Sequence, residues 1–243
     1  MDKLTERQTQ ILKTLIEEYI ETAQPVGSET LDKKYNLGVS PATIRNEMAD
    51  LTTAGFLSQP HHSAGRSPTP KALRYYVENL MTPKKLSVAE EVAVKEKVWD
   101  YRYQLDKFLR EVTKALAQRT KTLALAATDQ GDFFSSGMAN ILEMPEFFDI
   151  DLTKSLLLSL DEFDFWKNLF LEMSPEDPFR LLLGEDLGRS VLQSCGFVFS
   201  CFEIPSKGKG VVGVVGPSRL NYSSIIPTVS YFGDLVTEIA RLW

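Results

Sequence analysis

Residues 36–48 constrain the fold more than any other part of the chain. Gly38 closes a short polar turn, because glycine adopts positive φ at no steric cost. Ser40 and Pro41 then give a helix-start signal, a serine N-cap followed by proline at the first helical position. A short helix, this turn and a second helix with a small, polar outer face predict a helix-turn-helix domain.

The flanking residues extend this motif to a winged-helix plan. Thr5 and Gln8 fit a capping box at the start of a first amphipathic helix, and Ser28 is expected to cap the next one. The expected elements are helices at 5–22 and 29–35, a helix from Pro41 that Gly55 stops, a strand at 56–59, a loop at 60–68 and a helix at 69–81. We therefore expect residues 1–82 to form a winged-helix DNA-binding domain.

The helix that begins at Pro41 has two distinct faces. Ile44, Met48 and Leu51 recur at helical spacing and predict its buried face. The side chains expected to point outward into a major groove are Pro41, Ala42, Thr43, Arg45 and Asn46. An ordinary surface helix that binds no nucleic acid is the alternative interpretation.

Each outward residue type suits one kind of DNA contact. Ala42 and the methyl group of Thr43 can touch a thymine methyl group, and Asn46 can pair with adenine. Arg45 can reach a guanine or a phosphate. Ser40 and the helix N-terminus favour a phosphate, because free N–H groups and the helix dipole attract anions.

Basic residues around this helix are predicted to contact the DNA backbone. The candidates for phosphate contacts are Lys33, Lys34, Lys71 and Arg74. Arg66, at the tip of the loop, is expected to enter a minor groove or grip the backbone. His61 and His62 either hydrogen-bond phosphates or have only a loop role.

The charge distribution is compatible with a DNA-binding N-terminal region, although the whole chain carries a net charge of −6. Residues 28–85 hold 8 Lys and Arg against 5 Asp and Glu, whereas the part after residue 85 is acidic. Because this positive field is weak, affinity is expected to depend on dimerisation and on a good operator sequence.

Composition and motifs argue against an enzyme, a metalloprotein or a membrane protein. The 243 residues have an average globular composition, with no apolar run of membrane-spanning length and no apolar core of a signal peptide, so a cytoplasmic location is expected. Cys195 and Cys201 are too far apart along a strand for a disulfide and are expected to be buried apolar residues. Phosphate-loop and dinucleotide fingerprints are missing, so we expect no cofactor.

Residues 83–120 are interpreted as a linker followed by one long helix, which Ser87 and Glu90 begin. Its apolar residues follow a heptad pattern: Val94, Val98, Tyr101, Leu105, Phe108, Val112 and Ala115. This spacing favours either pairing between two subunits or packing of the helix on its own domain, and the two readings are equally good. The segment is therefore a candidate dimer contact.

Residues 121–243 predict an α+β domain. Strands are expected at 121–128, 179–183, 195–203 and 211–215, with a loop containing Gly131 and Gly137 after the first and a hairpin turn at 207–210. Helices are expected at 155–173 and 224–242, the second with Val229, Phe232, Val236 and Ile239 inside.

Several segments of the chain closely resemble the HrcA family of heat-inducible transcription repressors. The resemblance is dense over residues 4–81, with departures at His62, Ser67, Pro70, Ala72 and Leu73. The segments that carry it are 21–28, 39–51, 60–69, 74–77, 140–147 and 213–222. It implies a winged helix followed by a GAF-like domain, a homodimer on an inverted-repeat double-stranded DNA operator of chaperone genes, and support of repression by a GroEL-type chaperonin.

The chain departs from that family in length. Family members are about a hundred residues longer, and almost nothing stands between Thr128 and Gly137, where GAF strands and an inserted dimerisation domain are expected. A reduced GAF-like domain is therefore predicted. Two alternatives to a heat-shock repressor stay open, a winged-helix regulator whose C-terminal domain senses a small ligand and a winged helix that binds protein.

Overall fold

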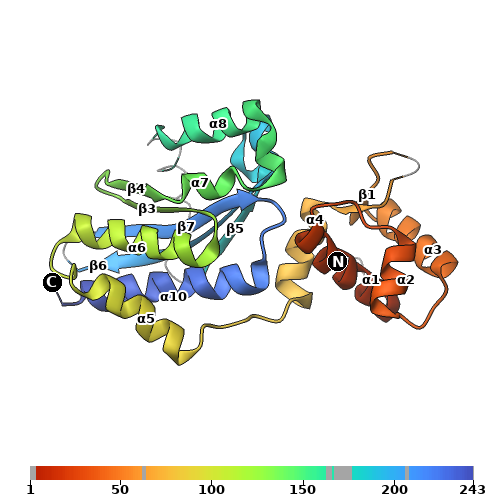
Figure 1. Ribbon diagram of the computed structural model, residues 1–243, viewed down its shortest axis with the longest axis horizontal. Helices are drawn as coiled ribbons and strands as arrows, with labels where there is room; N and C mark the ends of the chain where they lie inside the picture. Colours follow the sequence, from red (N-terminus) through yellow and green to blue (C-terminus); the bar gives the residue numbers. More distant parts are fainter. Residues whose placement is uncertain (1–3, 62–63, 163–165, 167–176, 206–207, 243) are drawn as a thin grey trace. The chain divides into compact units, whose positions relative to one another are not determined.

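The computed structural model of the chain describes residues 4–242 except 62–63, 163–165, 167–176 and 206–207 (Figure 1). The chain divides into two compact units, Met1–Thr82 and Pro83–Trp243, which we call unit 1 and unit 2. Among the described residues, no helix has the length and apolarity needed to cross a bilayer.

Unit 1 has the predicted winged-helix order. Its elements are α1 (Glu6–Thr22), α2 (Ser28–Tyr35), α3 (Pro41–Thr53), β1 (Leu57–Ser58), β2 (Ser67–Pro68), α4 (Pro70–Tyr75) and the π-helical turn η1 (Tyr76–Leu80). β1 and β2 pair antiparallel, with Leu57 opposite Pro68, and form the wing. The core collects buried apolar residues from every helix, including Ile11, Leu15, Leu31, Ile44, Met48, Leu51 and Leu73.

Local sequence signals set most helix ends in unit 1. The capping box at Thr5 is confirmed, because Thr5 Oγ1 accepts from the Gln8 N–H at 3.2 Å and Gln8 Oε1 accepts from the Thr5 N–H at 3.1 Å. The prediction for α2 was wrong by one residue. Gly27 is its N-cap and Ser28 is its first helical residue.

Unit 2 is an α+β domain built on one antiparallel sheet. Its elements are α5 (Val88–Trp99), α6 (Leu105–Thr120), β3 (Leu123–Thr128), β4 (Phe133–Ser136), α7 (Met138–Ile141), η2 (Pro145–Phe148), α8 (Ile150–Leu160), β5 (Arg180–Leu183), η3 (Gly184–Leu187), η4 (Ser190–Leu192), β6 (Cys195–Ile204), β7 (Gly208–Pro217) and α10 (Tyr222–Ala240). The strand order is β4-β3-β7-β6-β5, and each neighbouring pair is antiparallel.

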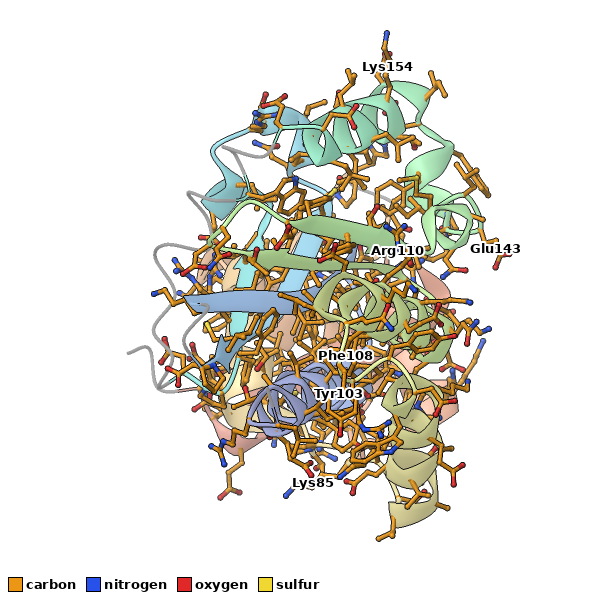
Figure 2. All side chains as sticks on the ribbon, turned by 90° about the vertical axis from the view of Figure 1, so that its left-hand side faces the viewer. Lys85, Tyr103, Phe108, Arg110, Glu143 and Lys154 are labelled. Atoms are coloured by element: carbon orange, nitrogen blue, oxygen red, sulfur yellow. The ribbon has the colours of Figure 1, made fainter. Side chains whose placement is uncertain are left out.

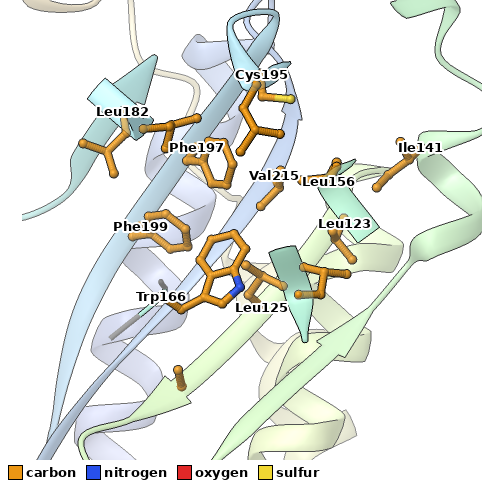
Figure 3. Packing of buried hydrophobic residues seen from close by; sticks show 14 of the residues in the cluster. Leu123, Leu125, Ile141, Leu156, Trp166, Leu182, Cys195, Phe197, Phe199 and Val215 are labelled. Carbon is orange, nitrogen blue, oxygen red and sulfur yellow. The ribbon is translucent and has the colours of Figure 1, made fainter. Parts of the chain in front are cut away.

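Helices cover both faces of this sheet. Alternate residues of β3 and β6, such as Leu125 and Phe197, join Leu156 of α8 in one buried cluster around Trp166 (Figure 3). The indole N–H of Trp166 donates to the Ser159 carbonyl at 2.6 Å, which satisfies its only polar group. On the opposite face lie α6, with Phe108 fully buried, and α10 (Figure 2).

Gly233 lets α10 approach β6 closely. A Cβ at this position would lie 2.4 Å from Ser200 Oγ and 2.9 Å from Ser200 Cβ. Ser200 is itself buried and donates to the Pro178 carbonyl at 3.2 Å, so it has little room to move. The glycine therefore sets the distance between helix and sheet.

The prediction of one long helix within residues 83–120 was wrong. α5 ends at Trp99 and α6 starts at Leu105, and the two helices pack on each other. The break is stabilised by Arg102, whose guanidinium lies 4.6 Å from the Trp99 ring centroid and donates to the Trp99 carbonyl at 2.8 Å.

Three smaller predictions for unit 2 also differ from the structure. The expected loop at Gly131–Gly137 contains strand β4, because residues 133–136 pair with β3. Residues 208–210 extend β7, and the remaining hairpin residue Lys207 lies outside the described residues. The helix expected at 155–173 is α8, which starts at Ile150 and ends at Leu160. Of the rest of that prediction, residues 163–165 and 167–173 lie outside the described residues.

Candidate nucleic-acid interface

α3 is held in unit 1 by one buried face. Ser40 Oγ accepts from the Thr43 N–H at 3.2 Å, and Pro41 is the first helical residue, as predicted. Ile44, Met48 and Leu51 are at most 3% exposed, which confirms the predicted inner face. These buried contacts leave the opposite face of α3 in solvent.

The outer face of α3 carries most of the side chains predicted to touch DNA. Ala42, Arg45 and Asn46 are exposed, whereas Pro41 and Thr43 are half-buried. Arg45 and Asn46 form no side-chain hydrogen bond or ion pair with any other residue that the structure describes. Both side chains are therefore available to a ligand.

Two further contacts shape the N-terminal end of this face. Thr43 Oγ1 lies 3.0 Å from Ser40 Oγ, so both hydroxyl groups already take part in the helix cap. Glu47 lies 3.4 Å from Arg7 of α1, which partly neutralises its charge. The sequence reasoning did not weigh Ala49 and Asp50, which are also exposed on α3. Their helical spacing from Asn46 and Ala42 could have identified them.

Lys34 forms two ion pairs inside unit 1. Its Nζ lies 2.7 Å from Glu18 Oε2 and 3.0 Å from Glu21 Oε2. Tyr35 also donates to Glu18 Oε2, at 2.6 Å. The hydrogen bond from Lys34 has the largest effect and that from Tyr35 the next largest, and both lower the pKa of the buried Glu18 carboxyl. A phosphate would have to compete with two carboxylates for Lys34.

The other predicted backbone contacts differ in availability. Lys33 is 79% exposed and lies 3.9 Å from Glu29, an ion pair worth little in solvent. Lys71 donates to the Ala54 carbonyl at 2.9 Å and lies over the Phe56 ring at 4.4 Å. Arg74 is half-buried. Lys33 is therefore the most accessible cation of this set.

The wing places Arg66 near α2. Arg66 and Val26 form an antiparallel bridge, with N–H to carbonyl distances of 2.9 Å in both directions. Arg66 Nη1 donates to Gln59 Oε1 at 2.7 Å, and Gln59 Nε2 donates to the Ala64 carbonyl at 3.0 Å. His61 is exposed, and His62 lies outside the described residues.

The cysteines and possible metal ligands of unit 2 form no reactive site in the part of the chain that the structure describes. No group of three or more His, Cys, Asp or Glu side chains there is arranged to hold a metal ion. Both cysteines are free. Burial raises the pKa of the Cys195 thiol to about 12, so it is protonated at neutral pH.

Comparisons with known proteins agree with this geometry. The family profile described as "Winged helix-turn-helix transcription repressor, HrcA DNA-binding" matches residues 3–81, and the profile "HrcA protein C terminal domain" matches residues 69–226. A crystal structure of a protein described as hypothetical has a TM-score of 0.78 at 18% identity, with 98% of each chain covered, and thus shares the fold.

Curated relatives cover nearly the whole chain. The heat-inducible transcription repressor HrcA of Clostridium tetani is 27% identical over 344 aligned positions, which include 100% of this chain and 95% of that protein. The heat-inducible transcription repressor HrcA of Moorella thermoacetica is 26% identical, and the alignment covers 97% of this chain and 98% of that protein. Because the first alignment has 344 positions and this chain has 243 residues, at least 101 positions of the alignment have no counterpart here.

Proposed function

The chain belongs to the HrcA family of winged-helix transcription repressors, and we propose that two copies bind an inverted-repeat operator and repress chaperone genes until heat stress. The observation that carries this proposal is α3, whose apolar face is buried while Ala42, Arg45 and Asn46 stay in solvent without partners among the described residues. A single α-helix fits the major groove, and residues near its N-terminal end reach base edges.

Ala42 and Asn46 would read bases, and Arg45 would reach a guanine or a phosphate. Ser40, Pro41 and Thr43 would meet the backbone where the helix begins. Lys33 and the wing, with His61, His62 and Arg66, would contact phosphates. Lys34, Lys71 and Arg74 would contribute where a phosphate displaces their present partners.

Selection of bound duplexes from a random pool tests this function. A two-fold-symmetric consensus, with half-sites about one or two helical turns apart, is expected for a dimer with one α3 in each major groove. Recovery of random sequences with weak affinity would instead favour a winged helix that binds protein. The ligand-sensing alternative has no specific observation in its favour among the described residues.

Most of the heptad residues are buried, whereas Tyr101 and Leu105 are half-buried. Val94, Val98, Phe108, Val112 and Ala115 are all buried inside unit 2. This burial favours packing of these residues on their own domain over a contact between two subunits. The exposed side of α5 offers a different surface, with Val88 77% exposed, Val92 50%, Trp99 38% and Tyr103, in the following turn, 67%.

We place the dimer contact on this α5 stripe, defined by Val88, Val92, Trp99 and Tyr103. The stripe is self-complementary about a point between Lys95 and Glu96. An antiparallel second copy would set Val92 against Trp99, because these two residues are equally distant from that point along α5. Lys95, which already donates to Glu238 of its own chain at 2.6 Å, would also meet Glu96 of the second copy.

A charge exchange tests this contact. Lys95→Glu and Glu96→Lys, each alone, would place like charges across the two-fold axis and lower the dimer fraction in analytical ultracentrifugation. Mixing the two variants would restore pairing as a heterodimer. Leu142→Ser, at another exposed apolar residue, serves as a control that leaves the dimer intact. Unchanged dimerisation of both single variants would exclude the stripe.

A chaperonin is proposed to act on unit 2. Leu142, Phe148 and Ile150, which are 58%, 72% and 73% exposed, form apolar surface around α7, η2 and α8. Lys154 extends from the outer side of α8 (Figure 2). Exposed apolar side chains are what a chaperonin binds in its clients, so Phe148→Ser with Ile150→Ser should weaken binding to a purified GroEL-type chaperonin. Unchanged binding would count against this surface.

A further inference from the structure

A groove of about 590 Å³ lies within unit 1, where α2 begins. Its walls come from three elements. They are the first turn of α2 at Gly27–Thr30, Arg45 and Met48 of α3, and the wing residues Gln59, Ala64, Gly65 and Arg66. We call it the α2 groove.

The first turn of α2 brings hydrogen-bond donors without acceptors to this groove. The N–H groups of Ser28, Glu29 and Thr30 precede the first intrahelical bond, which runs from the Leu31 N–H to the Gly27 carbonyl at 3.2 Å. Gly27, as N-cap, has no side chain that could accept from them. Such N–H groups, together with the helix dipole, attract an anion.

Ser28 gives a second, independent sign of a ligand. Its side chain is only 6% exposed and lines the α2 groove. Its hydroxyl has no hydrogen-bond partner among the described residues. No buried side-chain oxygen or nitrogen among the described residues lacks a partner, so this hydroxyl stays accessible from the groove that Ser28 lines. An anion oxygen in the groove would satisfy it.

A backbone bridge holds the wing against the start of α2, so that Arg66 lies at the edge of the α2 groove. The Val26–Arg66 bridge joins the residue before the α2 N-cap to the wing. Gly65 permits this approach, since a Cβ there would lie 2.5 Å from the Val26 carbonyl carbon. Gln59 Oε1 accepts a hydrogen bond from Arg66 Nη1 at 2.7 Å. The other N–H groups of the guanidinium remain available to a ligand.

We propose that the α2 groove holds one phosphate of the DNA backbone, between the N-terminus of α2, Arg66 of the wing and Arg45 of α3. This rests on the proposed function and assigns Arg45 to the backbone rather than to a guanine. The Glu29 carboxylate also lines the groove and opposes the phosphate, although Lys33 lies 3.9 Å away from it. The phosphate would fix how deeply α3 enters the major groove.

The test measures binding of the full chain to its selected operator and to a random duplex over a salt series. Arg66→Gln removes a guanidinium, and Ser28→Asp puts a carboxylate where the phosphate oxygen would sit. Both should weaken binding to the two duplexes alike, by roughly 10- to 100-fold, because hydrogen bonds to charged groups are strong. The slope of log K against log salt should fall by about 0.9 for one lost phosphate contact.

Matched variants define the groove. Lys33→Gln, just outside it, should change affinity less than Arg66→Gln, and Glu29→Gln should strengthen binding. Operators with one methylphosphonate at successive positions locate the phosphate. A methylphosphonate at one position should weaken binding of the wild type more than binding of Arg66→Gln, which keeps only the contacts from α2 and Arg45. Thermal melting confirms that each variant is folded, and Arg66→Gln carries the test where Ser28→Asp does not fold.

Three outcomes would overturn the proposal. Folded variants with unchanged affinity and salt slope would exclude the α2 groove while leaving the proposed function intact. A loss for Arg66→Gln on the operator alone, at unchanged slope, would mean that Arg66 reads bases in a minor groove. Absence of any duplex selected by the wild type would overturn both the groove and the proposed function.

Discussion

Replacing Gly65 by alanine should detach the wing from the start of α2. The added Cβ would lie 2.5 Å from the carbonyl carbon and 2.6 Å from the carbonyl oxygen of Val26. These are backbone atoms, so no side-chain rotation relieves the overlap. The Val26–Arg66 bridge, with its two hydrogen bonds of 2.9 Å, must open or shift.

The magnitude follows from opposing contributions. Two backbone hydrogen bonds contribute about 1 kcal/mol each, and overpacking costs about 1–3 kcal/mol when the bridge stays closed. Alanine lowers the entropy of the unfolded chain, which offsets about 0.4–1 kcal/mol. The net destabilisation of unit 1 is thus about 1–2 kcal/mol, with a fall in Tm of roughly 4–8 °C per kcal/mol for a domain of this size.

Thermal unfolding followed by circular dichroism, together with duplex titration, measures both consequences. Gly27→Ala is the matched control, because its Cβ would meet nothing closer than Thr30 Oγ1 at 3.9 Å. It should stay within about 1 kcal/mol of the wild type. A Gly65→Ala protein with the Tm and DNA affinity of the wild type would refute the role assigned to the bridge.

Two further predictions concern unit 2. The pKa of Glu90 is lowered to about 2 by the Ser87 N–H, the Ser87 hydroxyl and Arg119, so its contribution to stability is present above pH 4.5 and is lost as pH falls towards 2. Urea unfolding should therefore show a stability difference between wild type and Glu90→Gln that is largest at neutral pH and vanishes near pH 2, and a constant difference would contradict it. Gly233→Ala gains about 1 kcal/mol of helix propensity but meets Ser200 Oγ at 2.4 Å, so overpacking of about 1–3 kcal/mol should dominate and give net destabilisation. In a double-mutant cycle with Ser200→Gly, this penalty should shrink to the part caused by the Cys201 carbonyl oxygen at 3.0 Å, and an unchanged penalty would show that the serine is not the obstacle.

The helix starts of unit 1 could be predicted because their signals are local. Thr5 with Gln8, and Ser40 with Pro41, are separated by three residues or fewer, and each cap forms within its own helix turn. The buried face of α3 follows from helical periodicity for the same reason. Once Ile44 faces inward, the exposure of Asn46 is fixed by geometry.

What depends on contacts distant in sequence could not be predicted. Residues 100–104 contain neither glycine nor proline, so the heptad pattern suggested one helix, and only the packing of α6 on α5 explains the turn at Arg102. Strand β4 is visible only from its pairing with β3. The sequence predicted a phosphate contact for Lys34. Its actual partner Glu18 is 16 residues away and reaches Lys34 only when α1 and α2 pack together.

The most direct measurement compares wild type and Asn46→Ala on the selected operator and on a random duplex at one salt concentration. Asn46 is exposed on α3 and has no side-chain partner among the described residues. Replacing it by alanine therefore removes a contact with DNA and no contact within the protein. Loss of a bidentate contact should cost about 1–3 kcal/mol on the operator and little on random DNA. Thr53→Ala, at the far end of α3, should change neither affinity. Equal losses of Asn46→Ala on both duplexes would contradict the claim that α3 reads base edges.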